Sequence, residues 1–393
     1  MKRTLQAILL FLALACICVM VLMRLGLPDT VTPPPTVAPT AESVSTPPPT
    51  ATPTPTPPPT PTPEPEYYTI SVVGDCTLAS HQLLSDQNPK SFAYRMSGDY
   101  GYPFANTVQY FADDDFTIAN LECTFSDHSL YSYQYFYFQS PTDWAQILIE
   151  GSVEFVTTAN NHMQDFGSTG AEDTYDALDK WQIAYGKENE TRLYTTESGL
   201  KVGVYCASRE NFSDGPDSIY TVNKEKALAA IQKLKADGAE YIICAFHWGK
   251  ELKYRPYDSQ VEVAHACIDA GANLIYGSHT HCLQPIEEYN GGIILYSMGN
   301  WSFGGNTNPS DWDTALVQLR IKRDIDGTIA NDGFSVVPCC CSESKVNDDN
   351  DYKPTPYEEG TEAYERIISK LDGSYAGGDG NVDYSGWLGR ITG

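Results

Sequence analysis

The stretch that decides the fold reads 274-LIYGSHTH-281, an apolar run that ends in a glycine, a serine and two histidines. The apolar residues 274–276 are typical of a strand that is covered on both faces. Gly277 lets the backbone turn after the strand without steric penalty. His279 and His281 stand two positions apart, so their rings are expected to project to the same side. The stretch therefore predicts a buried strand that delivers two imidazoles to one edge of a sheet.

The same arrangement, an apolar run followed by polar residues, recurs on both sides of this stretch. Its other instances are 69–73 before Gly74-Asp75, 116–119 before Asn120-Leu121-Glu122, 153–158 before Asn160-Asn161-His162, 241–246 before His247, and 293–297 before Asn300. In open α/β sheets, ligands bind beyond the carboxyl ends of the strands. Six strand ends are thus predicted to bring Asp, Glu, Asn and His side chains to a common site.

Helical patterns alternate with these strands, and this alternation indicates an α/β sheet layered with helices. Strand 202–207 completes the central set, and later strands are predicted at 314–321 and 334–338. Helices are predicted at 144–150, 169–181, 224–237, 259–270 and 362–371.

The polar residues at the strand ends share one ligand chemistry. Taken singly, each has a plainer explanation: Asp75 as a helix N-cap, Asn160-Asn161 as a turn, and a lone histidine as a hydrogen-bonded structural residue. Taken together, they predict a divalent metal site. Imidazole mixed with carboxylate and amide oxygens suits Mn, Fe or Zn better than Ca or Mg.

Composition excludes one class of partner. The chain of 393 residues has a formal net charge of −26. A surface this acidic repels phosphate backbones, so nucleic-acid binding is not expected.

The N-terminal residues indicate export. Lys2 and Arg3 precede an apolar run at 5–23 that is long enough to cross a bilayer, so residues 1–27 are predicted to be an uncleaved membrane anchor. A cleaved signal peptide ending near Ala13 and Ala15, or a lipoprotein acylated at Cys16, remains the alternative. Residues 28–66 hold 16 of the 26 prolines and form a predicted extended linker. The predicted folded domain, residues 67–341, would then face outward from the cell membrane, followed by an acidic extension at 342–393.

An alternating run of tyrosines offers a different kind of site. Tyr131, Tyr133, Tyr135 and Tyr137 would form an aromatic stripe on one face of a strand. Such a stripe either stacks on sugars or packs within the protein.

The order of the polar segments resembles that of the bacterial capsule-synthesis CapA family, which is associated with poly-γ-glutamate production. The resemblance spans about residues 68 to 305. It rests on Gly74-Asp75, Ala119-Asn120-Leu121-Glu122, Ala159-Asn160-Asn161-His162 with Asp165 and Gly167, His247-Trp248-Gly249 with Glu251, Gly277-Ser278-His279-Thr280-His281, and Ser297-Met298-Gly299-Asn300.

The resemblance implies a metallophosphatase-like layered α/β sandwich, with two mixed β-sheets flanked by helices and a metal at the sheet edge. It implies as metal ligands Asp75, Asn161, His247, His279 and His281, with Asn120 or Glu122 in the bridging position. It further implies His162 as the acid that protonates a leaving group. Asn160, Asp165, Glu251 and Asn300 are expected to support these groups or to contact substrate.

One departure from the metallophosphatase pattern matters. That pattern begins Asp-x-His, whereas this chain has Asp75-Cys76-Thr77. One of two metal positions therefore lacks a ligand, and the site is expected to hold one or two ions.

Two functions follow as hypotheses. In the first, the metal activates water to cleave a phosphoester or related bond, with His162 as general acid. In the second, the domain keeps its metal without catalysis and helps to assemble or tether a surface polymer. The expected partners are the membrane, the capsule polymer and other membrane proteins of polymer synthesis.

Overall fold

The computed structural model describes residues 64–129, 131–132, 136–209, 219–344 and 349–377. The predicted anchor at 1–27 and almost all of the predicted linker lie outside the described residues. No helix among the described residues combines the length and apolar character that crossing a membrane requires. All described residues belong to one compact unit, Thr62–Gly393.

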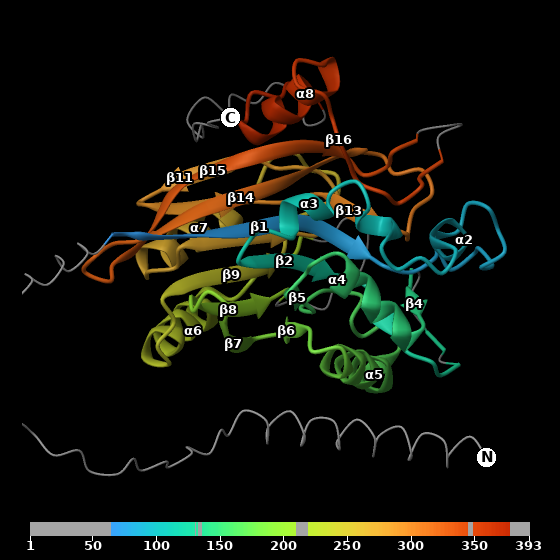
Figure 1. Cartoon of the computed structure of the whole chain (residues 1–393), viewed down its shortest axis with the longest axis horizontal. Helices are drawn as coiled ribbons and strands as arrows, with labels where there is room; N and C mark the ends of the chain where they lie inside the picture. Colours follow the sequence, from blue (N-terminus) through green and yellow to red (C-terminus); the bar gives the residue numbers. More distant parts are fainter. Residues whose placement is uncertain (1–63, 130, 133–135, 210–218, 345–348, 378–393) are drawn as a thin grey trace, which may run out of the picture. The chain divides into compact units, whose positions relative to one another are not determined.

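The larger of two main sheets has eight strands in the order β16-β15-β14-β1-β2-β5-β6, with β13 also paired to β1 (Figure 1). Strands β1, β2, β5 and β6 run parallel, whereas β14, β15 and β16 form an antiparallel extension. The strands are β1 (Glu66–Thr77), β2 (Phe116–Leu121), β5 (Phe155–Thr157), β6 (Ala184–Gly186), β13 (Asn300–Phe303), β14 (Asp313–Arg323), β15 (Ile329–Cys340) and β16 (Thr355–Pro356).

The smaller main sheet has six strands in the order β11-β12-β10-β9-β8-β7. Its four central strands are parallel and both edges are antiparallel. The strands are β7 (Glu190–Thr195), β8 (Lys201–Ala207), β9 (Tyr241–His247), β10 (Leu274–Ser278), β11 (Ile286–Tyr289) and β12 (Gly292–Leu295). A separate two-stranded ribbon pairs β3 (Thr124–Phe125) with β4 (Gln139–Ser140).

The two main sheets pack face to face around a shared apolar core. Ile70 and Val72 of β1 meet Val204 of β8, Ile243 of β9 and Leu274 of β10 in this core. Strands β2 and β9 are buried along their whole length, which explains their continuous apolar sequences.

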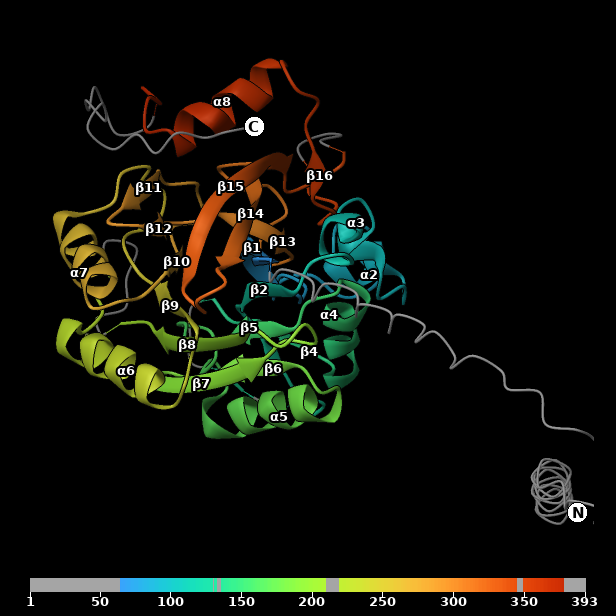
Figure 2. The ribbon, with the colours of Figure 1, turned by 60° about the vertical axis from the view of Figure 1, so that its left-hand side comes forward.

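Helices cover the outer face of each sheet, as Figure 2 shows. A second core lies under the helices beside the larger sheet, and a third under α6 and α7 beside the smaller sheet. The helices are α2 (Phe92–Met96), α3 (Val108–Phe111), α4 (Gln146–Glu150), α5 (Gly167–Lys180), α6 (Lys224–Ala236), α7 (Asp258–Asp269) and α8 (Glu362–Leu371), with 3₁₀ turns at Tyr102–Phe104 and Thr142–Ala145. The predicted layered α/β sandwich with two mixed, helix-flanked sheets is confirmed.

Helix α8 (red in Figure 2) lies against β14 and β15. Thr361 caps it by accepting a hydrogen bond from the Tyr364 backbone, and Ile367 and Leu371 enter the core between the sheets. Described residues beyond 341 thus contribute to the folded unit, through α8 and through β16.

Three local expectations were wrong. Asp75 and Asn120 lie inside β1 and β2 and not beyond them, because a register shift between Val72 and Asp75 lets the pairing resume after Gly74. Asn300 does not follow its sheet edge but opens the new strand β13. The tyrosine stripe forms no continuous strand among its described members: Tyr131 is exposed, Tyr137 lies before β4, and Tyr133 and Tyr135 lie outside the described residues.

Candidate metal centre

The centre forms where three neighbouring strands of the larger sheet place polar residues side by side. Asp75 of β1 pairs with Asn120 of β2 on one side and with Asn300 of β13 on the other. The Asn120 amide donates to Oδ1 of Asp75 over 2.9 Å. The inserted strand β13 thus brings a residue from a distant part of the sequence directly beside Asp75.

Two glycines allow the backbones around the centre to approach closely. A Cβ on Gly74 would lie 2.0 Å from the carbonyl oxygen of Gly299, which accepts a hydrogen bond from the Asp75 backbone N–H at 2.8 Å. A Cβ on Gly277 would lie 1.9 Å from the carbonyl oxygen of Tyr296. Gly277 was expected to allow a backbone turn. The structure instead requires glycine there because the backbone at Tyr296, directly after β12, packs too close for a side chain.

The left-handed backbone appears instead at the two histidines that follow. His279 has φ 91° and His281 has φ 55°, values that cost non-glycine residues of order 1–3 kcal/mol each. Both residues contact one carboxylate oxygen, Oδ2 of Asp75, His279 through its backbone N–H at 3.3 Å and His281 through Nδ1 at 3.4 Å. The turn geometry, and not strand alternation, brings both histidines to Asp75.

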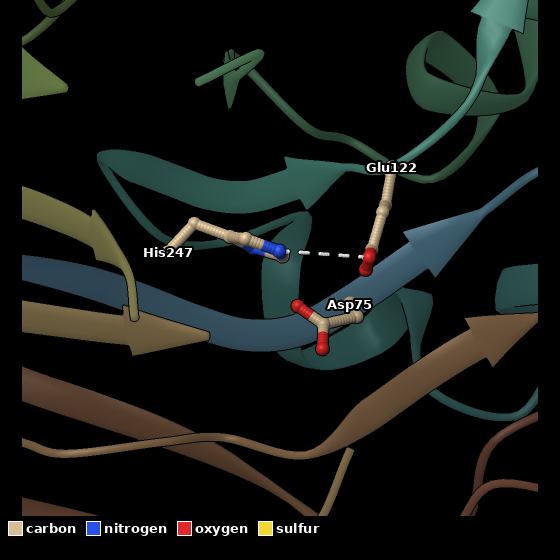
Figure 3. A group of neighbouring side chains, drawn as sticks. All are labelled: Asp75, Glu122 and His247. Atoms are coloured by element: carbon tan, nitrogen blue, oxygen red, sulfur yellow. Dashed lines mark ion pairs between the residues drawn. The ribbon is translucent and has the colours of Figure 1, made fainter. Parts of the chain in front are cut away.

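Asp75, Glu122 and His247 are three residues of the centre whose possible ligand atoms lie close together (Figure 3). All three side chains are buried, and one ligand atom from each lies within 4.8 Å of the others. His247 Nε2 lies 3.6 Å from Oε1 of Glu122. That Oε1 atom is buried and accepts no hydrogen bond from the described residues.

His247 directs Nε2 toward this cluster and anchors its other nitrogen. Nδ1 lies 2.9 Å from the Ser278 hydroxyl, whereas Nε2 lies 2.7 Å from Oδ1 of Asn161 and 3.1 Å from Nδ1 of His279. A partner on the outer nitrogen fixes the ring's orientation, as is usual for metal-binding histidines. The predicted ligands Asn161, His247 and His279 thus converge on one point.

Asn120 and Asn160 brace the centre. The Asn160 side-chain amide donates to Oδ1 of Asn120 at 3.1 Å, and Oδ1 of Asn160 accepts the backbone N–H of His162 at 3.1 Å. Asn120 therefore presents its nitrogen to Asp75 and Glu122 while its oxygen is occupied. Of the two candidates for a bridging ligand, this geometry favours Glu122.

His162 stands at the edge of the cluster, held by Asp165. Its Nδ1 lies 2.9 Å from Oδ2 of Asp165, which also accepts the Phe138 backbone N–H at 2.9 Å. Its Nε2 lies 3.9 Å from Oε1 of Glu122. One face of the His162 ring packs on Phe138, with centroids 4.6 Å apart.

A cleft of about 170 Å³ opens beside His162 and His281. Phe303 and Glu251 line its wall, with Glu251 exposed, and Oδ1 of Asn300 lies 2.9 Å from Nδ1 of His281. Of the residues predicted at the site, His162, Glu251, His281 and Asn300 line this cleft.

Burial and mutual charge perturb the ionisable groups strongly. Burial and the neighbouring Asp75 raise the pKa of Glu122 well above its usual value. Burial, together with His279 and His281, lowers the pKa of His247 well below its usual value. For His281, burial lowers the pKa, but the Asp75 hydrogen bond and the Glu122 and Asp75 charges outweigh it and raise the pKa to about 10.

These residues fit a divalent cation. Two carboxylates buried together repel each other unless a positive charge lies between them, and the unpartnered Oε1 of Glu122 faces Nε2 of His247 at 3.6 Å. The donors are imidazole, carboxylate and amide oxygen, the set expected for Mn, Fe or Zn. Asp75, Glu122, Asn161, His247, His279 and His281 would hold the ion.

Three supporting residues were missed from the sequence. Ser278 orients His247, Phe138 packs on His162, and Tyr220 stacks on His279 with centroids 4.1 Å apart. Ser278 could have been found, since it lies inside the decisive stretch. Tyr220 and Phe138 carry no chemical signal of a site in the sequence.

Solved structures with partial similarity to this chain include phosphoesterases. Calcineurin-like phosphoesterase YfkN from Bacillus subtilis is 14% identical, with a TM-score of 0.41 over 70% of this chain and 90% of that one. The 5'-nucleotidase precursor from Thermus thermophilus is 13% identical, with a TM-score of 0.43 over 78% of this chain and 58% of that one.

Sequence relatives carry names from capsule synthesis. The capsule biosynthesis protein CapA of Bacillus anthracis is 27% identical over 65% of this chain and 64% of its own length. The PGA biosynthesis protein CapA of Bacillus subtilis is 28% identical over 66% of this chain and 68% of its own. The chain thus spans about two thirds of the length of these relatives.

The strongest assignment comes from a family model. Residues 69–304 match the model of the bacterial capsule synthesis protein PGA_cap. This segment contains Asp75, Glu122, His162, His247 and His281 and ends just after β13, so it covers the whole candidate centre. The chain therefore belongs to the bacterial capsule synthesis protein family PGA_cap.

Proposed function

We propose that this chain is a metal-dependent hydrolase of phosphoester or related bonds that acts in capsule or poly-γ-glutamate synthesis or export. One observation carries the proposal. The buried, unpartnered Oε1 of Glu122 faces His247 at 3.6 Å and His162 at 3.9 Å, so a carboxylate, a ligand imidazole and an acid meet at one point.

In this proposal the metal ligands and His162 have different roles. A divalent cation at such a centre supplies Lewis acidity toward an ester oxygen and a nucleophile at neutral pH. Asp165 holds Nδ1 of His162, which leaves Nε2 directed at the centre to deliver a proton to a leaving group. Because the cleft of about 170 Å³ is lined by His162, the leaving group departs through it. Phe138 and Phe303 form part of the apolar lining on that side.

Hydrolysis of bis(p-nitrophenyl) phosphate by the purified chain, assayed with Mn²⁺, Fe²⁺ and Zn²⁺ in turn, tests the proposal. We expect release of p-nitrophenol that requires the metal and disappears after chelation. Elemental analysis of the same preparation identifies the bound ion. Metal that binds stoichiometrically without turnover of this or related esters would contradict the proposed hydrolysis.

His162→Ala is expected to lower the turnover number about 100-fold while leaving the metal content unchanged, because His162 donates a proton and holds no metal in this scheme. Turnover with the p-nitrophenolate leaving group and with a more basic alkoxide leaving group is the measurement. The loss should be greater for the alkoxide, which needs the proton more.

His128→Ala is the matched control for this prediction. His128 also pairs with an aspartate, its Nδ1 lying 2.7 Å from Asp173, but its side chain is exposed and it lies outside the centre. The His128→Ala variant should therefore retain the turnover number of the wild type. Equal losses in the two variants, or no loss in His162→Ala, would refute the acid role.

The alternative is a non-catalytic assembly or tethering component, and Thr77 favours it. Thr77 stands where metallophosphatases have the Asp-x-His histidine, and its hydroxyl is used in a 3.1 Å hydrogen bond to the Glu122 carbonyl. Fewer ligands weaken a second metal position. A protein that binds metal, lacks esterase activity, and is required for polymer retention on the cell would support this alternative.

For location and partners, we propose a single-pass anchor at residues 1–27, with the folded unit outside the cell membrane. The apolar run at 5–23 and the proline-rich segment 28–66 support this proposal. Capsule polymer and membrane proteins of polymer synthesis would be within reach of a tethered domain. Protease accessibility of intact cells, with cytoplasmic marker proteins as control, tests the orientation.

A further inference from the structure

A second, larger cleft of about 410 Å³ lies against the turn that carries Asn160 and Asn161. Its wall includes Arg209, Lys226 and Glu188. It shares no lining residue with the cleft beside His162. The candidate centre therefore has two separate approaches with different linings.

The larger cleft is connected directly to the candidate metal ligands. Asn161, on its wall, places Oδ1 2.7 Å from Nε2 of His247. Arg209 donates from Nη1 to the Tyr220 hydroxyl at 3.0 Å, and the Tyr220 ring stacks on His279. Arg209 is thereby held at the boundary between this cleft and the centre.

Among the described residues that line this cleft, the cationic side chains outnumber the carboxylates, the reverse of the balance in the whole chain. Arg209 and Lys226 are cationic, and Lys226 makes no side-chain hydrogen bond or ion pair within the described part of the chain. Glu188, the one carboxylate among the described lining residues, accepts hydrogen bonds from the Ser208 backbone N–H and hydroxyl, and its charge also interacts with Lys226 and Arg209. Two cations against one carboxylate in the described lining leave a net positive charge, which in a chain of net charge −26 favours an anionic occupant.

We propose that this cleft binds an anionic group of the substrate, a carboxylate or a phosphate, through Arg209 and Lys226. This proposal rests on the proposed function, because it assumes that the bond to be cleaved lies at the metal centre. The substrate then extends from this anion cleft across the centre to the aromatic cleft beside His162. The proposed substrate is therefore a linear molecule, and the part of it that lies in the anion cleft carries negative charge.

Equilibrium binding to the metal-depleted full chain tests the proposal without any need for turnover. The probes are a γ-linked glutamate tetramer, tripolyphosphate and, as the neutral control, a γ-linked glutamine tetramer. We expect at least one anionic probe to bind, the neutral tetramer to bind far more weakly, and added salt to weaken binding. The tighter anionic probe identifies the source of the charge as carboxylate or phosphate.

Lys226→Met should weaken anion binding about tenfold, the loss expected for one charge-assisted contact. Arg209→Gln should do the same, with unfolding temperature as a check because Arg209 also contacts Tyr220. Lys224→Met is the matched control: it lies on the same helix, pairs with Glu262 and does not line the cleft, so binding should not change.

Unchanged anion affinity in Lys226→Met and Arg209→Gln, equal binding of the neutral tetramer, or no binding of either anion would overturn the proposal. Failure of hydrolysis alone would leave it standing, because the binding assay uses no metal and no scissile bond. Anion binding without hydrolysis would refute the proposed hydrolase and keep the anion cleft.

Discussion

Glu122→Gln is expected to raise the thermal stability of the metal-depleted protein and, at the same time, to abolish its stabilisation by Mn²⁺. Both effects have one cause. In the absence of a cation, Glu122 is a buried carboxylate beside Asp75 with one oxygen unpartnered, which opposes folding. In the presence of a cation, the same oxygen would be a ligand.

The expected size follows from mass action. A cation present at about 1,000 times its dissociation constant stabilises the folded state by about 4 kcal/mol. For a domain of this size, that corresponds to a rise in unfolding temperature of roughly 10 °C. Differential scanning fluorimetry of wild type and Glu122→Gln, with Mn²⁺ and after chelation, measures it. In Glu122→Gln, Mn²⁺ should raise the unfolding temperature hardly at all.

The pH dependence has a definite sign. The pKa of Glu122 lies above its usual value of 4.5 in the folded chain, so the folded state keeps a proton that the unfolded state releases. Stability of the metal-depleted wild type should therefore fall as pH rises above 4.5, and Glu122→Gln should reduce that slope. A Glu122→Gln variant that is less stable without metal, yet still stabilised by Mn²⁺, would show that Glu122 is structural and not a ligand.

Glu154→Gln provides the control. Burial also raises the pKa of Glu154, to about 7, but this residue accepts the Thr117 backbone N–H and lies outside the centre. It should change the pH dependence between 4.5 and 7 in the same direction and leave the Mn²⁺ response intact. The comparison separates a general buried-carboxylate effect from metal binding.

The sequence predicted the central strands well because each is buried on both faces and so has a continuous apolar stretch. Strands β2 and β9 were found for this reason. The edge strand β7 was missed, since its residues are exposed or half-buried along its length and leave no apolar pattern. The four-residue strand β13 was missed as well, because its pairing with β1 is set by tertiary packing.

The composition of the centre was predictable, but its internal roles were not. Polar residues after apolar runs predicted Asp75, His247 and His281 as candidates, and the structure brings these three residues together. That Glu122 and not Asn120 keeps a free oxygen depends on Asn160, whose amide occupies the Asn120 oxygen from 40 positions away. Such a choice is made by three-dimensional hydrogen bonding, and a linear pattern does not contain it.

The second large effect is expected from Lys370→Met, which should destabilise the folded unit by about 3–5 kcal/mol. Lys370 is a buried lysine on α8, and its ammonium donates to both Asp311 oxygens at 2.8 and 2.7 Å and to Asp313 at 2.8 Å. Arg366 of the same helix donates to Asp313 at 2.7 and 2.6 Å. Removing the ammonium leaves Asp311 buried without its cation.

Chemical denaturation of Lys370→Met against wild type measures this loss, and Lys233→Met is the control. Lys233 also pairs with an aspartate, Asp237, but on the exposed surface of α6, so its removal should change stability by no more than about 0.5 kcal/mol. Equal effects in the two variants would contradict a stabilising role for the buried network under α8.

A double variant decides whether the cause is the uncompensated charge or lost packing. If the charge dominates, Lys370→Met combined with Asp311→Asn should be more stable than Lys370→Met alone, because the orphaned carboxylate is gone. If packing dominates, the second change should add its own loss. Asp311 directly follows Pro309 and Ser310, which line the cleft beside His162. Rescue of stability by Asp311→Asn would show that the loss in Lys370→Met comes from the uncompensated charge of Asp311, which stands next to this part of the cleft wall.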